Sequence, residues 1–198
     1  AGFAYDRLVM NGVAKSRDEI ALAVDPPIKA INVDSPFELE RIASVASELG
    51  TRANVALRGI PGVEGGSTAG IETGSERSKF GMTLAEIEQC LTLAEANRDS
   101  IAVVGLHVHI GSQMTDLGLY ADAARYVAER GGAIQARFPS DFRHINIGGG
   151  FPKTYVKYND QSPEIGYFHT TLTPADVAAT VMPILADVLG RNIEILTE

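Results

Sequence analysis

The sequence predicts an α/β fold, a TIM-type (β/α)8 barrel that is incomplete in this chain, on two observations. Short segments rich in Val, Ile and Leu alternate with longer amphipathic segments, which implies parallel strands joined by right-handed helical crossovers. Polar residues or glycines follow nearly every short segment, whereas an open doubly wound sheet normally carries its phosphate-binding residues after the first strand. Polar chemistry behind many successive strands is typical of a barrel, whose site is assembled at the carboxyl ends of the strands.

The individual elements follow from hydrophobic periodicity. Predicted strands are residues 7–11, 29–34, 53–58, 101–109, 144–147 and 193–197, and predicted helices are residues 17–24, 36–49, 84–97, 117–136 and 174–189. Four helices have the spacing of a capping box or its Asp variant at their start: Ser16 with Glu19, Ser35 with Glu38, Thr83 with Glu86 and Thr173 with Asp176. Gly50 and Gly190 stand where a helix end favours a left-handed residue.

Six strands are two fewer than a barrel needs, and both ends of the chain agree with that shortfall. The first residues read as a helix end and a loop that feeds a strand, while Glu198 follows an apolar strand directly, with no helix to cover it. We therefore expect residues 1–198 to be one partial barrel domain of a longer protein, without its first strands.

Composition excludes several classes of function. The 198 residues are 45% hydrophobic and 21% charged, as in an ordinary globular domain, and the net charge is −8. The sequence contains no cluster of Lys or Arg that would bind nucleic acid or an anionic membrane. No apolar segment reaches the roughly 18 residues that a membrane span requires. We expect a small-molecule partner. Because Cys90 is a lone cysteine inside a predicted helix, we also expect a reducing compartment, the cytoplasm.

The segment GLHVHIGSQ, residues 105–113, has the highest concentration of candidate functional residues in the sequence. His107 and His109 would share one face of a strand, as metal ligands, ring-stacking groups or satisfied core residues. No metal site is predicted, because no carboxylate or third histidine follows at ligand spacing. Gly111 and Ser112 form a small, donor-rich turn suited to an anion.

Three consecutive glycines, Gly148, Gly149 and Gly150, follow the penultimate predicted strand. Glycine loses the most backbone entropy on folding, so the triplet indicates either a tight turn or a backbone that something approaches closely. Successive unhindered N–H groups can form an anion-binding nest, and the last loops of a barrel often bind phosphate. The position of the triplet favours a phosphate site.

Two charged residues, Glu198 and Arg58, also stand at predicted strand ends. In a barrel mouth the Glu198 carboxylate would need a cation or a hydrogen-bond donor; the alternative is a solvated chain end. Arg58 is suited to steering an anionic or aromatic group. Arg58 is the first residue of a long, glycine-rich connection, and connections of that length are usually functional or mobile. Ser78, Lys79 and Phe80 are candidates to hold this connection in place.

In this order the segments resemble the barrel domain of the fold-type III pyridoxal-phosphate (PLP) decarboxylases, which share their barrel with alanine racemase. The matching stretches cover nearly the whole chain: MNGVAKSRDEI, INVDSPFELERI, ANVALRGIPGV, TGSERSKFGMTLAEI, GLHVHIGSQMTDL, INIGGGFP and the terminal ILTE. The closest resemblance is to the branch of the family that acts on meso-diaminopimelate.

The resemblance implies PLP as the cofactor and gives each site residue a role. His109 would stack on the pyridine ring, and Ser112 with the backbone of glycines 148–150 would bind the phosphate. Glu198 would pair with the ring nitrogen, as does the glutamate that opens the family's Glu-Pro-Gly-Arg motif, and Arg58 would lie near the cofactor. Glu198 and His109 are thus the implied catalytic residues.

The resemblance also implies that the whole protein is a homodimeric carboxy-lyase that converts meso-diaminopimelate to L-lysine. Decarboxylation of ornithine, arginine or a carboxylated polyamine precursor, non-catalytic PLP binding and an unrelated phosphate-binding isomerase barrel are the alternatives. The family has a C-terminal β domain and an upstream lysine that forms a Schiff base with PLP, and nothing in residues 1–198 matches either. These residues alone are therefore expected to be inactive.

Overall fold

The computed structural model describes residues 2–62, 80–157, 166–188 and 192–198, and its central feature is one curved sheet of six parallel strands. In spatial order these are β1 (Val9–Met10), β2 (Ala30–Val33), β3 (Ala53–Arg58), β4 (Ile101–His107), β5 (His144–Asn146) and β8 (Glu194–Leu196). The strands follow one another in chain order and run in one direction, as in a barrel that is not closed. The predicted incomplete (β/α) barrel is confirmed.

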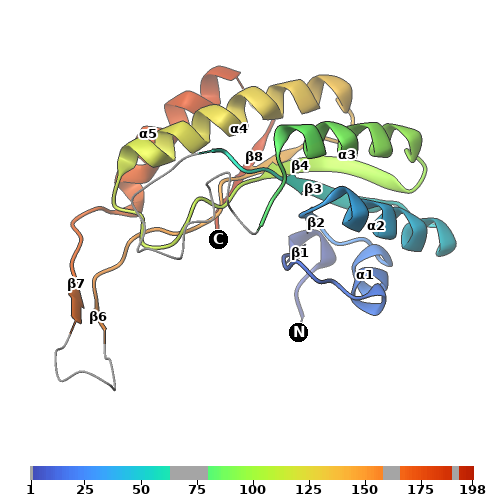
Figure 1. The fold of residues 1–198 in the computed structure, drawn as a ribbon, viewed down its shortest axis with the longest axis horizontal. Helices are drawn as coiled ribbons and strands as arrows, with labels where there is room; N and C mark the ends of the chain where they lie inside the picture. The colour runs from blue at the N-terminus through green and yellow to red at the C-terminus, as the bar shows by residue number, and fades with distance from the viewer. Residues whose placement is uncertain (1, 63–79, 158–165, 189–191) are drawn as a thin grey trace.

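Five helices cover one face of the sheet in an arc (Figure 1). They are α1 (Arg17–Val24), α2 (Pro36–Glu48), α3 (Leu84–Ala96), α4 (Leu117–Arg137) and α5 (Pro174–Val188), and a short 3-10 helix, η1 (Tyr5–Arg7), precedes β1. All five begin at the predicted residue and end within one residue of the predicted position. Gly50 has φ +63° behind α2, the left-handed conformation expected there, while Gly190 lies outside the described residues.

The capping residues explain where the helices begin. Ser16 and Thr83 each form a complete capping box with the glutamate three residues later. Thr173 and Asp176 exchange the same pair of bonds, with the Thr173 N–H donating to Asp176 Oδ2 at 2.8 Å. Ser35 differs: it accepts the Glu38 N–H, but the Glu38 carboxylate accepts the Asp34 N–H instead of that of Ser35. A buried lysine beside Glu38, described below, accounts for this departure.

The two faces of the sheet have different chemistry because side chains alternate along each strand. The face toward the helices is apolar and forms the main core, with strand residues such as Ile31, Val55, Leu57, Leu106 and Ile145 packed against α-helical Leu, Ile and Val side chains. The opposite face carries a separate small cluster of Ala30, Ala56, Ala102 and Val104. Beyond this cluster, toward the carboxyl ends of the strands, it carries Asn32, His107 and Asn146, all at most 2% exposed.

The sheet curls until β8, at one edge, contacts residues next to β1 and β2 at the other side. Lys29, just before β2, forms an ion pair with Glu194 of β8, with Nζ and Oε2 2.6 Å apart. At the other end of the strands, Asn11 Nδ2 donates to Glu198 Oε1 at 2.9 Å. These two contacts join the first strands of the sheet to its last strand.

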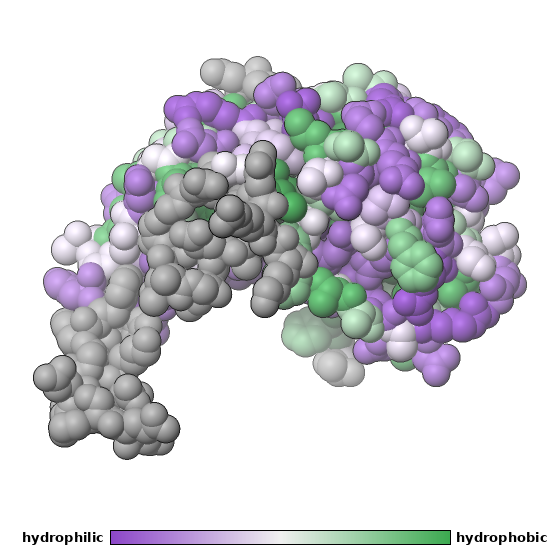
Figure 2. All heavy atoms as spheres, viewed as in Figure 1, coloured by the Kyte–Doolittle hydropathy of each residue, from purple (hydrophilic) through white to green (hydrophobic). Residues whose placement is uncertain are grey.

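The sequence did not predict the antiparallel hairpin of β6 (Tyr155–Lys157) and β7 (Gly166–Phe168), which projects away from the sheet (Figure 1). Its strands have three residues each, too short for a clear periodic pattern. The outer surface is largely hydrophilic with scattered apolar side chains in the view of Figure 2. Among the described residues, no helix has the length and apolar character needed to cross a bilayer.

A tight contact on the inner face gives a test of this packing. A Cβ on Gly105 of β4 would lie 2.4 Å from His144 Nε2 on β5, and His144 is fully buried. We expect Gly105→Ala to lower the free energy of unfolding of the whole protein by about 1–3 kcal/mol, as overpacking does. Chemical denaturation measures this.

Gly118→Ala is the matched control, since Gly118 is exposed in the first turn of α4 and its nearest neighbours are Asp116 side-chain atoms. Its effect should stay within about 1 kcal/mol. Equal losses in both variants would contradict the packing described.

Candidate active site

The carboxyl ends of the six strands bring the predicted polar residues to one rim. Arg58 ends β3, His107 ends β4, Asn146 ends β5, and Glu198 follows β8. Arg58 pairs in register with His107, and His107 with Asn146, so these side chains stand side by side on neighbouring strands. The predicted clustering of polar chemistry behind the strands is therefore present.

Glu198 is the centre of this rim. Its Oε1 accepts the Asn11 amide at 2.9 Å and the Asn146 amide at 3.0 Å, and His107 Nε2 lies 3.7 Å away. Burial raises the pKa of Glu198, but the Asn11 hydrogen bond, the nearby His107 and the Asn146 hydrogen bond outweigh it, and the pKa lies below its ordinary value. Glu198 is thus an anion held by donors, with its side chain 33% exposed, and is not a freely solvated chain end.

The two histidines of GLHVHIGSQ differ in environment. β4 ends at His107, so His109 lies in the connection that follows, and the expectation that both occupy one strand face is wrong. His107 is 1% exposed, and burial lowers its pKa to about 3. His109 is half-buried, and burial followed by the charge of Arg58 lowers its pKa as well. Both rings are therefore neutral at neutral pH.

The glycine triplet lies where three segments of backbone meet. A Cβ on Gly148 would lie 2.5 Å from the Val108 carbonyl oxygen, one on Gly149 2.4 Å from that of Glu198, and one on Gly150 1.9 Å from that of Gly111. Gly148 and Gly150 also have φ values of +70° and +81°, which side chains rarely adopt. The triplet is thus required by close backbone packing.

This packing also places the predicted anion-binding groups together. Ser112 Cα lies 3.5 Å from the position of a Cβ on Gly150. The Gly149 N–H has a long, 3.5 Å contact with His109 Nδ1. Ser112, His109 and the triplet are therefore neighbours on the rim, although they come from two separate connections.

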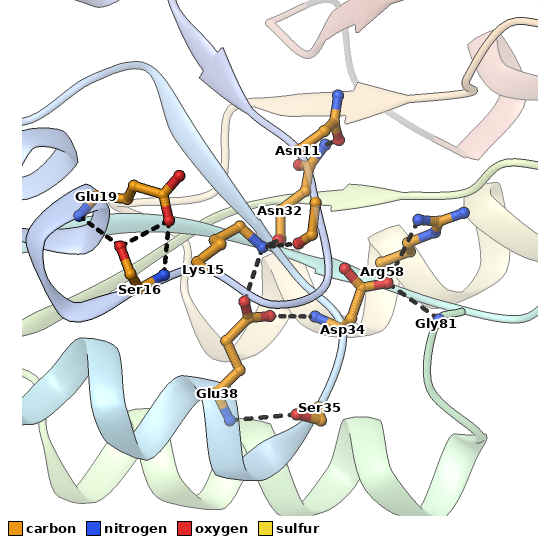
Figure 3. Close-up of polar contacts among 11 residues, drawn as sticks. Asn11, Lys15, Ser16, Glu19, Asn32, Asp34, Ser35, Glu38, Arg58 and Gly81 are labelled. Carbon is orange, nitrogen blue, oxygen red and sulfur yellow. Dashed lines mark hydrogen bonds and ion pairs between the residues drawn. The ribbon is translucent and has the colours of Figure 1, made fainter. Parts of the chain in front are cut away.

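A second group of charges lies beside the rim (Figure 3). Arg58 Nη1 is 3.3 Å from Asp34 Oδ1, which also accepts the Gly81 N–H at 3.1 Å. Burial raises the pKa of Asp34 in spite of the charges of Arg58 and Lys15. Arg58 also lies over the ring of Phe80, with its guanidinium carbon 5.5 Å from the ring centre, while Ser78 and Lys79 lie outside the described residues.

Lys15 follows the first predicted strand, as the sequence indicated, but its partners were not predicted. It is 4% exposed and donates to the Asn32 carbonyl at 2.7 Å, to Glu38 Oε1 at 2.8 Å and to the Gly12 carbonyl (Figure 3). This pairing explains why the Glu38 carboxylate does not complete the predicted capping box. The partners are 23 residues apart, and no spacing rule of helices or strands connects them.

The rim has unsatisfied polar atoms and space beside it. Among the described residues, buried side-chain atoms without a hydrogen-bond partner include Asn32 Oδ1, Asp34 Oδ2 and both ring nitrogens of His107. A cavity of about 420 Å³ between the edge strands is lined in part by Asn11, Asn146 and Glu198. Unpaired buried polar atoms cost free energy, so they fit a polar small molecule better than a finished core. In the described part of the chain no three His, Cys, Asp or Glu side chains are grouped to hold a metal ion.

Comparison with known proteins identifies the family. Residues 1–198 match the family described as "Pyridoxal-dependent decarboxylase, pyridoxal binding domain". The chain belongs to this family. Membership implies pyridoxal 5'-phosphate as the cofactor of the domain, as the sequence resemblance indicated.

Relatives in this family are diaminopimelate decarboxylases. Those of Bacillus methanolicus and Aquifex aeolicus are 36% and 32% identical over 169 and 193 residues, which is 84% and 98% of this chain but 39% and 43% of theirs. The solved Helicobacter pylori diaminopimelate decarboxylase complexed with L-lysine superposes with a TM-score of 0.80 at 28% identity, over 100% of this chain and 46% of that one. The chain thus spans less than half the length of these relatives.

Gly150 gives a test of the backbone packing. We expect Gly150→Ala to displace the 111–112 turn, because its Cβ would overlap the Gly111 carbonyl and its φ disfavours any side chain. In the whole protein it should cost about 2 kcal/mol or more of stability. Gly12→Ala, which shares a positive φ but has open space around it, should cost less. Equal costs would show that φ alone requires the glycine.

The buried histidines predict an acid-sensitive stability. Burial, then the charges of Lys29 and Arg143, lower the pKa of His144 to about 4. Below pH about 6.5 the unfolded chain binds protons that folded His107 and His144 do not. The free energy of unfolding should therefore fall as pH drops from 6.5 to 4, by up to about 1.4 kcal/mol per pH unit for each histidine.

Denaturant unfolding of the whole protein from pH 7.5 to 4.5 measures this slope. His144→Leu should remove the contribution of one proton, since leucine cannot be protonated. If the variant's free energy of unfolding changed with pH as steeply as that of the wild type, His144 would have the same pKa in the folded and unfolded states.

Proposed function

We propose that the whole protein is a PLP-dependent amino-acid decarboxylase and that this chain is the barrel domain that binds the cofactor. The observation that carries the proposal is the anionic Glu198, held by two amide donors on a rim that also bears a neutral imidazole and the glycine triplet. PLP combines a basic ring nitrogen, an aromatic face and a phosphate. Each of these three parts has a complementary group on the rim.

The residues take the following roles in this proposal. Glu198 pairs with the ring nitrogen, and His109 stacks on the ring. Ser112 and the backbone of Gly149 and Gly150 bind the phosphate, a role supported by their proximity on the rim. Gly148, which the sequence also predicted for this role, donates its N–H to Asn146 Oδ1 at 2.8 Å instead. Arg58 lies beside the cofactor, with its orientation fixed by Asp34 and Phe80.

The chain's residues make this rim suitable for decarboxylation. When bound, PLP supplies an electron sink for the pair of electrons left behind as CO2 departs. Glu198 keeps a proton on the ring nitrogen, because an anion there favours the charged ring. The phosphate contacts provide binding energy and orientation away from the reacting carbon, and the neutral His109 ring fixes the plane of the cofactor.

The proposed substrate is meso-diaminopimelate, with L-lysine as the product. The support is the name of the relatives, diaminopimelate decarboxylase, at 30–36% identity. An arginine decarboxylase of a Chlorella virus has a similar structure, with a TM-score of 0.72, but at 20% identity this likeness concerns the fold alone. Arginine and ornithine are therefore comparison substrates in the test.

We further propose that the whole protein is a cytoplasmic homodimer with a second, C-terminal β domain. The resemblance to the family supports the dimer and the second domain. Cys90, which is buried and unpaired, agrees with a reducing compartment.

The test uses the whole protein, freed of cofactor and then supplied with PLP. We expect it to bind PLP and to release CO2 and L-lysine from meso-diaminopimelate, as measured by amino-acid chromatography. Glu198→Gln should slow turnover by roughly 100-fold or more, because a neutral amide no longer favours the protonated ring. CO2 release only from arginine or ornithine would overturn the substrate, and PLP binding without CO2 release from any of them would overturn the enzyme.

A further inference from the structure

The two oxygens of the Glu198 carboxylate are in different situations. Within the described part of the chain, both hydrogen bonds to the carboxylate end on Oε1, from Asn11 Nδ2 at 2.9 Å and Asn146 Nδ2 at 3.0 Å. Oε1 thus has two donors, while Oε2 is left for another donor. This asymmetry is built by two amides from different strands.

Neighbouring groups fix the orientation of both amides. Asn146 Oδ1 accepts the Gly148 N–H at 2.8 Å, so its NH2 group must point toward Glu198. Asn11 Oδ1 accepts Asn32 Nδ2 at 2.6 Å, which sets its orientation in the same way. Reversing either amide would put two acceptors or two donors against each other. Each asparagine is therefore held as a donor to the carboxylate.

The two amides also hold Glu198 from opposite sides. Asn146 belongs to β5, the hydrogen-bonded neighbour of β8, and is 2% exposed. Asn11 follows β1, the strand at the opposite edge of the sheet. A carboxylate that accepts hydrogen bonds from both sides cannot rotate toward solvent without losing one of them. Such charge-assisted hydrogen bonds are about twice as strong as neutral ones.

We propose that Asn11 and Asn146 are positioning residues that fix the Glu198 carboxylate and direct Oε2 at the ring N–H of the bound cofactor. The inference rests on the proposed function, because it assumes that Glu198 pairs with that nitrogen. Asn11 and Asn146 do not touch the cofactor in this scheme. They act only through Glu198.

The test compares two ligands that differ only at the ring nitrogen. One is PLP, and the other is its analogue with C–H in place of that nitrogen, which gives Glu198 nothing to pair with. Binding of each to the cofactor-free whole protein is measured by titration, without any turnover. Asn11→Ala is the main variant, since Asn146 also holds the Gly148 N–H.

Asn54→Ala is the matched control. Asn54 lies on β3, donates to the Ile28 carbonyl at 2.7 Å, and is not a partner of Glu198. This variant measures the effect of removing an amide side chain from the inner face without removing a donor to Glu198. Asn11→Asp is a second variant, which replaces the donor by an acceptor of the same size.

We expect Asn11→Ala to weaken PLP binding about tenfold, the effect of losing one hydrogen bond to a charged group, and to change binding of the analogue less than about twofold. Asn11→Asp should weaken PLP binding at least as much, and Asn54→Ala should affect neither ligand by more than about twofold. Equal weakening of both ligands, or no weakening of either, overturns the positioning role. Wild-type protein that binds neither PLP nor the analogue overturns the proposed function itself, which separates the two failures.

Discussion

The parallel hydrogen bonding of the six strands is the constraint on which the site depends. Because every strand runs the same way, every carboxyl end reaches one rim, and residues far apart in the chain become neighbours. The register sets the pairs: Arg58 lies opposite His107, and His107 opposite Asn146. Curvature then brings Glu198, behind the last strand, against Asn11, behind the first.

One face of the sheet contributes mainly to stability, and the other face carries the residues of the candidate site. Its outer face supplies the apolar core against the helices, and its inner face carries small alanines and then polar groups. Several of these inner atoms, on Asn32, Asp34 and His107, are buried without a partner in the described part of the chain. Such atoms lower stability, and they are the feature expected where a polar ligand completes the hydrogen bonding.

Backbone packing and ligand binding meet at the glycine triplet. Each of Gly148, Gly149 and Gly150 is needed because another backbone carbonyl lies where its Cβ would be. The same convergence places Ser112 and His109 beside the triplet. The proposed phosphate site is therefore a consequence of how three connections pack on the rim.

The sequence by itself determined the five helices, the six parallel strands and most of the residues on the rim, but not the β6–β7 hairpin. Local signals suffice for these, since capping residues such as Ser16 and Thr83 start the helices and hydrophobic periodicity marks the strands. Only the tertiary structure decided how the residues pair. Glu198 meets Asn11 across 187 positions, Lys15 diverts Glu38 from its cap, and His109 leaves the strand that holds His107. The physical reason is that sheet curvature and the burial of charge create these contacts, and neither leaves a periodic pattern in the chain.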